Sequence, residues 1–457
     1  MNGSDYRDTC SYATISVKTL HFLSDYLTNH TVVISCNRIS IPMGIWHMKI
    51  IIISDLHVGD AAVSNEFSVG SSNNAVKNQF LNELRQLSNQ EDIRADYLVV
   101  AGDITNRATR EEFELASTRL KEIAEIVGVE QEKVFFVPGN HDGNWAEEER
   151  SMTSKESIKM TIDRKYSNLR FNDFFKQCLD RARFGCYFNE PYFAIWSDEH
   201  LNIIGVNSSV FDHYDRKPHH GVIRKQDLTE LDRKLQEMQI AHSGKINLLV
   251  VHHHPIQQPD LPFDAADHSI LQNAAILMEI ASKHNVNFIV HGHKHIPRLA
   301  QYSDDYQHPI NILCAGSFSA RLDDRWFQGV PNTIHQIEID KICDVNKTPL
   351  GKVVSWSHNT GHGWTKDESI NGIPHKEFFG NRMLPVELKK QLKESIERFF
   401  ETQTHVKWSE LSNHYADIIY TSRKLLEKTI MDLSDEVGFT IFKTPGQDEL
   451  FILLKGK

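Results

Sequence analysis

The stretch that most constrains this chain is residues 48–60, which read Met-Lys-Ile-Ile-Ile-Ile-Ser-Asp-Leu-His-Val-Gly-Asp. Four consecutive isoleucines are too few to span a membrane, and they predict a strand buried on both faces of a sheet. Asp55 and His57 follow directly. In extended backbone, residues two apart point the same way, so a carboxylate and an imidazole leave the sheet together, at the edge where open α/β sheets bind ligands. This pair predicts a metal site that other parts of the chain complete.

Later segments repeat the arrangement of a buried strand that ends in polar side chains. Helical apolar periods over 80–87 and 110–127 separate the first three strands. The further strands are predicted over 96–103, 134–138, 202–209, 245–255, 286–295, 310–315 and 333–339. The order β-α-β-α-β at the start is typical of a layered α/β enzyme.

The size and charge of the chain limit the classes of protein to which it can belong. Its 457 residues suffice for a large core and for two domains. A formal net charge of -11 argues against a chain-wide electrostatic grip on nucleic acid or on an anionic membrane, although a local basic groove stays open. Six scattered cysteines without a CxxC pair indicate reduced thiols in a cytoplasmic protein. No apolar run approaches the roughly 18 residues of a membrane helix.

Residues 1–47 lack the basic start and the apolar centre of a signal peptide, and they show no clear periodicity. Met48 stands directly before the first strong strand. We therefore expect either that Met48 is the natural start or that residues 1–47 form a loosely attached extension.

The residues at the strand ends form a candidate set of metal ligands. Its members are Asp55, His57, Asp103, Asn140, His253, His293 and His295. Any one of them is more often a capping or hydrogen-bonded polar group than a ligand, but five strands that end in such residues favour a shared site. Imidazoles together with carboxylates suit Mn, Fe, Zn or Co, and one carboxylate, such as that of Asp103, can bridge two ions. A metal pair can lower the pKa of bound water to about 7 and can neutralise charge on a phosphoryl group.

These motifs resemble those of the calcineurin-like metallophosphoesterase family. The family series is DxH, GDxx, GNH(D/E), a later His and GHxH. Here it stands as Asp55-Leu-His57, Gly102-Asp103, Gly139-Asn-His-Asp142, His-His-His-Pro from 252, and Gly292-His-Lys-His295. Each block alone is a weak signal, whereas five blocks in family order over about 48–340 are specific. The resemblance implies a four-layer α/β/β/α metallophosphoesterase sandwich over 48–356.

The resemblance also implies roles for these residues. It assigns one metal ion to Asp55, His57, Asp103 and His295, and the second to Asp103, Asn140, His253 and His293. His253 is chosen among the three consecutive histidines because the family ligand lies two residues before the proline; His252 and His254 would then face the opposite side of the strand. His141 matches the histidine that stabilises or protonates the leaving oxygen, and Asp142 would orient His141 or a ligand. The expected cofactor is a pair of divalent or trivalent ions of Mn, Fe or Zn.

The reaction that the resemblance implies is phosphoester hydrolysis by a hydroxide that bridges the two metal ions. The run Asp103-Ile-Thr-Asn-Arg-Ala, with Asn207, Gly221 and Gln226, resembles the class III cyclic-nucleotide phosphodiesterase branch. This favours a phosphodiesterase with a nucleotide-type substrate. Members that cleave DNA or RNA share the core motifs, so a nuclease is the alternative.

Two further segments leave choices open. Residues 143–190 look like an insertion that could cap a site, and its side chains Trp145, Arg150, Phe171, Phe174 and Phe175 could stack on a base, although simple packing is the favoured interpretation. The loop with His213, His219 and His220 is expected to be a solvated rim rather than a third metal site.

The C-terminal part is predicted to be separate. Residues 357–383 are rich in Gly, His and Asn and indicate a linker. Residues 384–457 contain helical runs and an alternating stretch around a Pro-Gly turn, which indicate a small α+β, winged-helix-like module. Over 385–457, eleven Lys/Arg stand against twelve Asp/Glu, and this balance favours a contact with protein, or between copies of the chain, over a contact with nucleic acid. A binding module with the phosphoesterase as its effector is the second alternative function.

Overall fold

The computed structural model describes residues 47–456 apart from 71–78, 216–218, 259–268, 304–307, 323–326, 328, 344–347, 360, 370, 416 and 444–449. The expected N-terminal extension over 1–47 therefore lies almost wholly outside the described residues. The Pro-Gly turn of the C-terminal hairpin lies outside them as well. None of the helices in the described ranges has the length and apolar character that crossing a membrane requires.

The first sheet is built around the isoleucine strand. Its strands are β1 (Met48–Ile53), β2 (Tyr97–Val100), β3 (Val134–Phe136), β11 (Asn332–Ile342), β12 (Pro349–Asn359), β13 (Gly363–Lys366) and β14 (Lys376–Phe379). They lie in the order β13-β12-β11-β1-β2-β3, with β14 also paired to β12. β1, β2 and β3 run parallel, and β11 pairs antiparallel with the other side of β1. The isoleucines at 50–53 are fully buried, which confirms the prediction of a central strand.

The second sheet lies against the first. Its strands are β4 (Phe184–Gly185), β5 (Phe193–Ser197), β6 (Leu201–Val206), β7 (Ile246–Val251), β8 (Phe288–His291), β9 (Arg298–Tyr302) and β10 (Ile310–Cys314), in the order β4-β5-β6-β7-β8-β10-β9. β6, β7, β8 and β10 are parallel to their neighbours in that run. Their carboxyl ends therefore reach one edge, as those of β1, β2 and β3 do in the first sheet.

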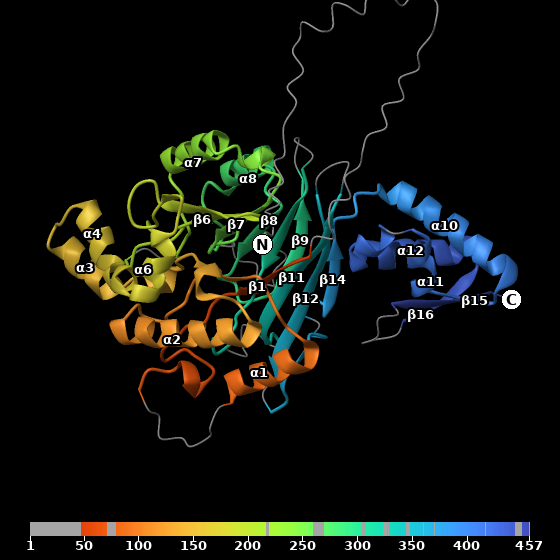
Figure 1. Ribbon diagram of the computed structural model, residues 1–457, viewed down its shortest axis with the longest axis horizontal. Helices are drawn as coiled ribbons and strands as arrows, with labels where there is room; N and C mark the ends of the chain where they lie inside the picture. Colours follow the sequence, from red (N-terminus) through yellow and green to blue (C-terminus); the bar gives the residue numbers. More distant parts are fainter. Residues whose placement is uncertain are drawn as a thin grey trace, which may run out of the picture. The chain divides into compact units, whose positions relative to one another are not determined.

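Helices cover the two outer faces. The larger ones are α1 (Phe80–Glu91), α2 (Arg110–Val127), α7 (Lys225–Glu237) and α8 (Ala274–Lys283), and the short 3-10 turns are η2 (Asn65–Phe67), η3 (Gln131–Lys133), η4 (Asn140–Asp142) and η5 (Ile240–His242). Figure 1 shows α1 and α2 on one side of the sheets and α7 and α8 on the other.

The side chains of β7 show how the layers form. Leu248 and Val250 belong to the core cluster that holds the first sheet, whereas Leu249 and Val251 pack with Leu277 of α8 in a second cluster. Alternate residues of a strand point to opposite faces, so one face of this sheet meets the other sheet and one meets helices. The four-layer α/β/β/α architecture is confirmed.

The insertion over 143–190 forms four short helices. They are α3 (Trp145–Thr153), α4 (Ile158–Lys165), α5 (Ser167–Phe171) and α6 (Asp173–Asp180). Phe174 and Phe175 are buried, and the Phe175 ring lies 4.9 Å from that of Phe136 in β3. These two aromatics pack, as the favoured interpretation expected, while Phe171 is 78% exposed.

The stretch expected to be a linker is partly folded. β13 and β14 both lie within 357–383, and both pair antiparallel with β12. Both strands are short, and the residues around them are rich in glycine and polar side chains, which is why the composition indicated a loop. They extend the first sheet instead of standing apart from it.

The C-terminal residues form helices and a small sheet with their own apolar core. The elements are α10 (Pro385–Thr402), β15 (His405–Lys407), α11 (Trp408–His414), η6 (Ile418–Tyr420), α12 (Arg423–Val437), β16 (Phe439–Lys443) and β17 (Phe451–Lys455). The strands lie in the order β15-β17-β16, and β16 pairs antiparallel with β17 as the predicted hairpin requires. The winged-helix-like assignment itself stays a prediction.

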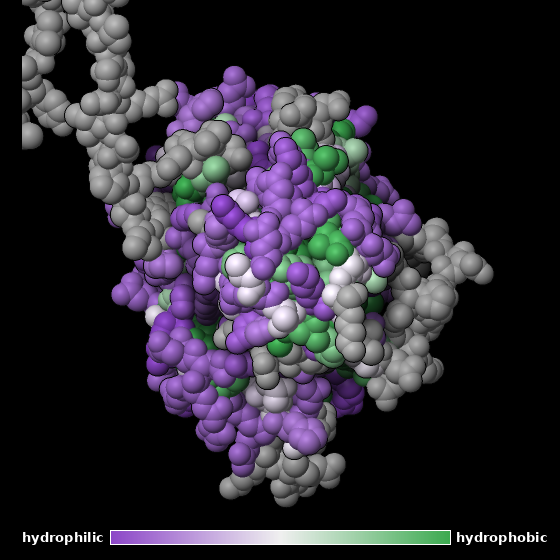
Figure 2. All heavy atoms as spheres, turned by 90° about the vertical axis from the view of Figure 1, so that its right-hand side faces the viewer, coloured by the Kyte–Doolittle hydropathy of each residue, from purple (hydrophilic) through white to green (hydrophobic). Residues whose placement is uncertain are grey.

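Exposed apolar side chains occur on this C-terminal part. Leu384, Val386, Met431 and Phe442 are each more than half exposed, at 63%, 80%, 57% and 51%. Figure 2 looks at this side of the molecule and shows apolar side chains among a largely hydrophilic surface. The distribution is compatible with the expected contact with protein.

A partly buried carboxyl joins the first sheet to the C-terminal helices. Glu377 of β14 accepts a hydrogen bond from the backbone N–H of Arg423, at the start of α12 (2.9 Å). Burial raises the pKa of Glu377 from its usual value of 4.5 to about 7. The folded protein therefore holds this proton more tightly than the unfolded chain does.

We predict that this carboxyl makes stability depend on pH. Its contribution is complete below pH 4.5 and is lost as pH rises through about 7. The variant Glu377→Gln should unfold at a temperature that falls less between pH 5 and pH 7 than that of the unmodified protein, as measured by differential scanning calorimetry. The exposed Glu387→Gln serves as control, and an unchanged pH dependence in Glu377→Gln would contradict the assignment.

Candidate metal centre

The candidate ligands come together at one edge of the two sheets. Each lies beyond the carboxyl end of a strand: Asp55 and His57 after β1, Asp103 after β2, Asn140 after β3, the histidines 252–254 after β7, and His293 and His295 after β8. Three overlapping groups have ligand atoms within 4.8 Å of one another: Asp55 with His57 and His295, His57 with Asp103 and His141, and Asp103 with His252 and His293.

Asp103 lies between the other members. Its Oδ2 is 3.5 Å from Nε2 of His57 and 3.2 Å from Nε2 of His252. Its Oδ1 accepts a hydrogen bond from the backbone N–H of His141 (2.8 Å). One carboxylate therefore faces histidines that come from both sheets.

Asp55 organises the first side of the site. Its Oδ1 lies 3.1 Å from Nε2 of His295 and 3.9 Å from Nε2 of His57. The backbone N–H of His293 points at both of its oxygens, at 3.2 and 3.1 Å. Because Asp55 comes from the first sheet and His293 and His295 from the second, these contacts tie the two sheet edges together.

The second side is formed by His293, Asn140 and the histidine run. Nδ1 of His293 lies 3.1 Å from the amide oxygen of Asn140. The ring centroid of His293 is 4.4 Å from that of His253 and 5.1 Å from that of His252. An imidazole and an amide oxygen are thus placed beside Asp103.

The structure departs from the expectation about the histidine run. β7 ends at Val251, so the alternation that would turn His252 away from the site does not continue. His252 points at Asp103, with its Nδ1 held by the carbonyl of Ala101 (2.8 Å). His253 contacts Ser208 through Nδ1 (2.8 Å). The geometry favours His252 over His253 as the histidine beside Asp103. His254 belongs to none of the three groups of clustered ligand atoms.

The backbone at the site is strained. Asp55, His57, Asp103, His293 and His295 all have positive φ, between 47° and 73°. This conformation costs a non-glycine residue about 1 kcal/mol. Hydrogen bonds offset the cost: the N–H groups of Asp55 and His57 donate to the carbonyls of Gly102 and Asp103, both at 3.0 Å.

The motif glycines are needed because neighbouring groups come too close for a side chain. A Cβ at Gly139 would lie 2.1 Å from Oδ1 of Asp103, and one at Gly292 would lie 2.3 Å from Oδ2 of Asp55. At Gly102, which also has a positive φ, a Cβ would lie 2.3 Å from Nδ1 of His252. Each glycine thus makes room for one candidate ligand.

Asp142 was predicted to orient His141 or a ligand, and its contacts are to the loops that carry two candidate ligands. Its carboxylate accepts hydrogen bonds from the N–H groups of Ile104, Thr105 and Gly139, at 3.1, 2.9 and 2.9 Å. It therefore joins the loop that carries Asp103 to the loop that carries Asn140. The side chain of His141 is instead held at Nδ1 by the carbonyl of Asn106 (2.9 Å), a contact that no motif indicated.

The residues present suit a metal pair. Within the described part of the chain, neither ring nitrogen of His57 has a hydrogen-bond partner, and the same is true of Nε2 in His253 and of Nδ1 in His295. Buried polar atoms are normally paired. Burial lowers the pKa of His57 and of His293 to about 3, so each ring is neutral and keeps a lone pair for a cation.

The carboxylates favour a cation at this place. Burial alone would raise the pKa of Asp103, but attraction to neighbouring imidazoles, above all that of His252, and a hydrogen bond with His252 outweigh burial and hold the pKa well below its usual range. The same attraction outweighs burial at His252 and raises the pKa of that imidazole. Two buried carboxylates, Asp55 and Asp103, thus create a strong preference for positive charge between the sheets.

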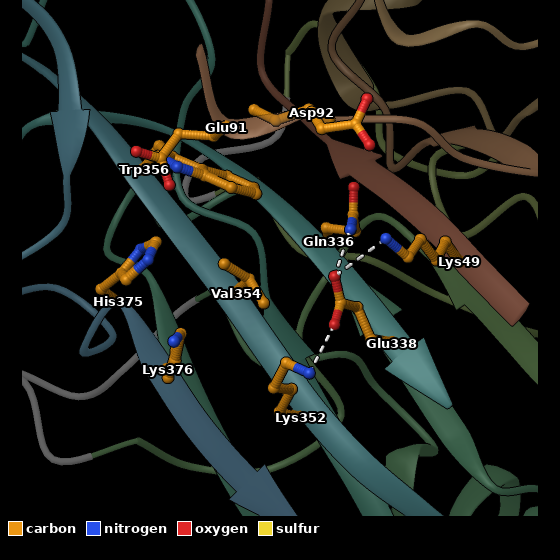
Figure 3. A pocket seen from close by; sticks show the side chains of 11 residues that line it. Lys49, Glu91, Asp92, Gln336, Glu338, Lys352, Val354, Trp356, His375 and Lys376 are labelled. Atoms are coloured by element: carbon orange, nitrogen blue, oxygen red, sulfur yellow. Dashed lines mark hydrogen bonds and ion pairs between the residues drawn. The ribbon is translucent and has the colours of Figure 1, made fainter. Parts of the chain in front are cut away.

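A cavity elsewhere on the first sheet lacks these features. It has a volume of about 210 Å³, and Figure 3 shows the side chains that line it. Glu338 accepts a hydrogen bond from the side chain of Gln336 (2.6 Å). It also forms ion pairs with Lys352 (2.6 Å) and Lys49 (3.5 Å). Glu338 in its wall is thus paired with two lysines, and none of the candidate metal ligands lines the cavity.

Comparison with known proteins agrees with this geometry. Residues 48–297 match the family model described as calcineurin-like phosphoesterase, which is more than half of the chain. The chain belongs to the calcineurin-like phosphoesterase family. It is therefore a phosphoester hydrolase with candidate groups for divalent metal ions.

Individual relatives of this calcineurin-like phosphoesterase are distant. A protein of Xenorhabdus bovienii described as a probable cyclic nucleotide phosphodiesterase is 22% identical over 262 residues, which cover 56% of this chain and 82% of that protein. Purple acid phosphatase from yellow lupin matches with a TM-score of 0.40 and 10% identity, over 71% of this chain and 53% of the phosphatase. The NAD nucleotidase of Haemophilus influenzae matches with a TM-score of 0.33 and 11% identity, over 70% of this chain and 60% of that enzyme.

The choice between the two histidines can be tested directly. After loading with Mn²⁺ and dialysis, we predict that His252→Ala retains less metal per chain than His253→Ala, because only His252 points at Asp103. Inductively coupled plasma mass spectrometry gives the metal content. Loss of metal in His253→Ala with full retention in His252→Ala would restore the assignment made from the motif.

The close approach at Gly139 gives a second prediction. Gly139→Ala should displace Asp103 and reduce bound metal and hydrolysis of bis-p-nitrophenyl phosphate together, by about 10-fold or more. Gly244→Ala is the control, because no atom lies within 4 Å of a Cβ there and the only cost is the positive φ of 69°, at the amino end of β7 and away from the candidate ligands. Equal behaviour of the two variants would show that the space at Gly139 is not essential.

Proposed function

We propose that this protein is a binuclear-metal phosphodiesterase that hydrolyses a nucleotide-type phosphodiester. The observation that carries the proposal is the position of Asp103, whose carboxylate faces candidate ligands from both sheets at 3.2 and 3.5 Å. A carboxylate so placed can be shared between two ions. The similarity to a protein of Xenorhabdus bovienii described as a probable cyclic nucleotide phosphodiesterase supports the substrate class.

The proposed ligand sets follow the geometry. Asp55, His57, Asp103 and His295 would hold one ion, and Asp103, Asn140, His293 and His252 would hold the other, with His252 in place of the His253 of the motif. A set of imidazole nitrogens and carboxylate or amide oxygens suits Mn, Fe or Zn. When bound, such a pair supplies activation of water and neutralisation of phosphoryl charge.

His141 is proposed as the group that protonates the leaving oxygen. Its backbone N–H donates to Asp103 and its Nδ1 faces the carbonyl of Asn106, so the ring is held next to the site. A carbonyl can only accept a hydrogen bond, so Nδ1 carries a proton. Nε2 is then the nitrogen that can pass a second proton to the departing alcohol.

Asp142 is proposed as a positioning residue. Its carboxylate holds the N–H groups of Ile104 and Thr105, which directly follow Asp103, and that of Gly139, which precedes Asn140. This single side chain therefore sets the distance between a candidate bridging ligand and a ligand of the second ion. Such supporting contacts commonly change metal affinity by about 10–100-fold when removed.

The substrate class and the role of Asp103 are tested together. Mn-loaded protein should hydrolyse bis-p-nitrophenyl phosphate and cyclic AMP but not single-stranded DNA. Asp103→Asn should reduce both activities by about 100-fold or more and should lower the metal content, because the shared ligand loses its charge. The matched control Asp180→Asn alters an exposed ion pair on α6 and should behave as the unmodified protein.

Different results would lead to different conclusions. Full activity in Asp103→Asn would contradict the metal-dependent mechanism. Cleavage of DNA with no action on cyclic AMP would replace the proposed substrate with that of a nuclease.

A further inference from the structure

A buried ion pair lies in the insertion next to the metal centre. Lys165 of α4 and Glu148 of α3 have side chains that are each 1% exposed, and Nζ lies 3.3 Å from Oε1. Lys165 also donates to the carbonyls of Ser209 (3.2 Å) and Asp212. Burying two charges is costly unless further polar groups satisfy them, so this pair demands one arrangement of α3, α4 and the loop that follows Ser209.

The same loop is tied back to the ion pair by histidines. Nδ1 of His213 lies 2.9 Å from Oε1 of Glu148, and the N–H of Tyr214 donates to Oε2 at 3.0 Å. Nδ1 of His219 lies 2.7 Å from Oδ1 of Asp212. The loop expected to be a solvated rim is therefore anchored on buried charges, with His213 and His219 only 21% and 19% exposed.

A stack of rings leads from this loop to His141. The His219 imidazole lies flat on the Trp145 indole, with centroids 4.6 Å apart and planes at 19°. Trp145 in turn lies 5.7 Å from the ring of His141, at 34°. Trp145 is the first residue of α3, and Glu148 follows one turn later. The contacts therefore form a circuit that runs from Glu148 to Lys165, Asp212 and His219, and from His219 back to Trp145 of the same helix.

The segment directly after His141 rests on the same lysine. A Cβ at Gly143 would lie 2.5 Å from Cε of Lys165, and the N–H of Asn144 donates to the carbonyl of Lys165 at 2.8 Å. The buried lysine thus contacts two parts of the circuit. One part is the backbone next to His141, and the other is the loop that carries His219.

We propose that Trp145 and His219 are positioning residues that hold the imidazole of His141 in the orientation for proton transfer. This inference rests on the proposed function. Among the described residues, the His141 ring makes one hydrogen bond, at Nδ1, and this bond does not by itself prevent the ring from tilting about that contact. Trp145 limits the tilt by packing beside the ring, and His219, fixed by Asp212, holds Trp145. The insertion serves to keep this stack in place.

Proton transfer matters most when the leaving alcohol is weakly acidic. The test uses substituted-phenyl esters of thymidine 5′-monophosphate, whose leaving phenols range from strongly to weakly acidic. Trp145→Ala and His219→Ala should lower kcat for the least acidic phenol by about 10–100-fold and should barely change kcat for the p-nitrophenyl ester. KM and metal content should stay the same, and Trp145→Phe, which keeps an aromatic face, should restore most of the rate.

A second variant separates positioning from general damage. If Trp145 acts through His141, the double variant His141→Ala/Trp145→Ala should be no slower than His141→Ala alone. Equal loss across all the esters, additive losses in the double variant, or no loss in Trp145→Ala would each overturn the inference. If the unmodified protein is active and the Trp145 and His219 variants match it on every ester, the proposed function stands and the positioning role does not.

A readout without catalysis completes the test. In metal-free protein labelled with ¹⁵N-histidine, His141 should give the spectrum of a single Nδ1–H tautomer, and in Trp145→Ala it should give averaged ring-nitrogen shifts. An identical spectrum in both proteins would contradict the inference whether or not any ester is hydrolysed.

Discussion

The buried carboxylate of Asp103 is the group on which the rest of the site depends. It faces His57 from its own sheet and His252 from the other, and it also receives the backbone N–H of His141. A buried anion is unfavourable unless positive charge or hydrogen bonds surround it. The fold meets this condition by bringing the ends of parallel strands from two sheets to one edge. Asp55 repeats the pattern with His295 and the backbone of His293.

Holding these groups so close requires local backbone strain. Five candidate ligands adopt positive φ, and three motif glycines leave no room for a side chain. Such strain persists when the surrounding structure determines it. Here the buried strands, the hydrogen bonds from β1 to the loop after β2, and the carboxylate of Asp142 all act on the same loops. The positions of the candidate ligands are therefore set by contacts from both sheets.

Much of this arrangement could be predicted because a buried strand is evident from its run of apolar residues, and its last residue must lie at a sheet edge. Asp55, His57, Asp103, Asn140, His293 and His295 were all placed at strand ends in this way, and the structure brings them together. The choice of His253 followed the family motif, in which the ligand lies two residues before the proline. The expectation that His252 faces away assumed that alternation continues past Val251, and the direction of a side chain beyond a strand depends on tertiary contacts. The Lys165 circuit joins residues 17 and 47 positions apart, a distance at which sequence periodicity carries no information.

The central claim is that Asp103 lies between two metal ions, and anomalous X-ray diffraction from crystals of the Mn-loaded protein tests it most directly. The account predicts two anomalous peaks, one on each side of the Asp103 carboxylate, the first beside His57 and His295 and the second beside His293. A single peak, or peaks that do not contact Asp103, would contradict it.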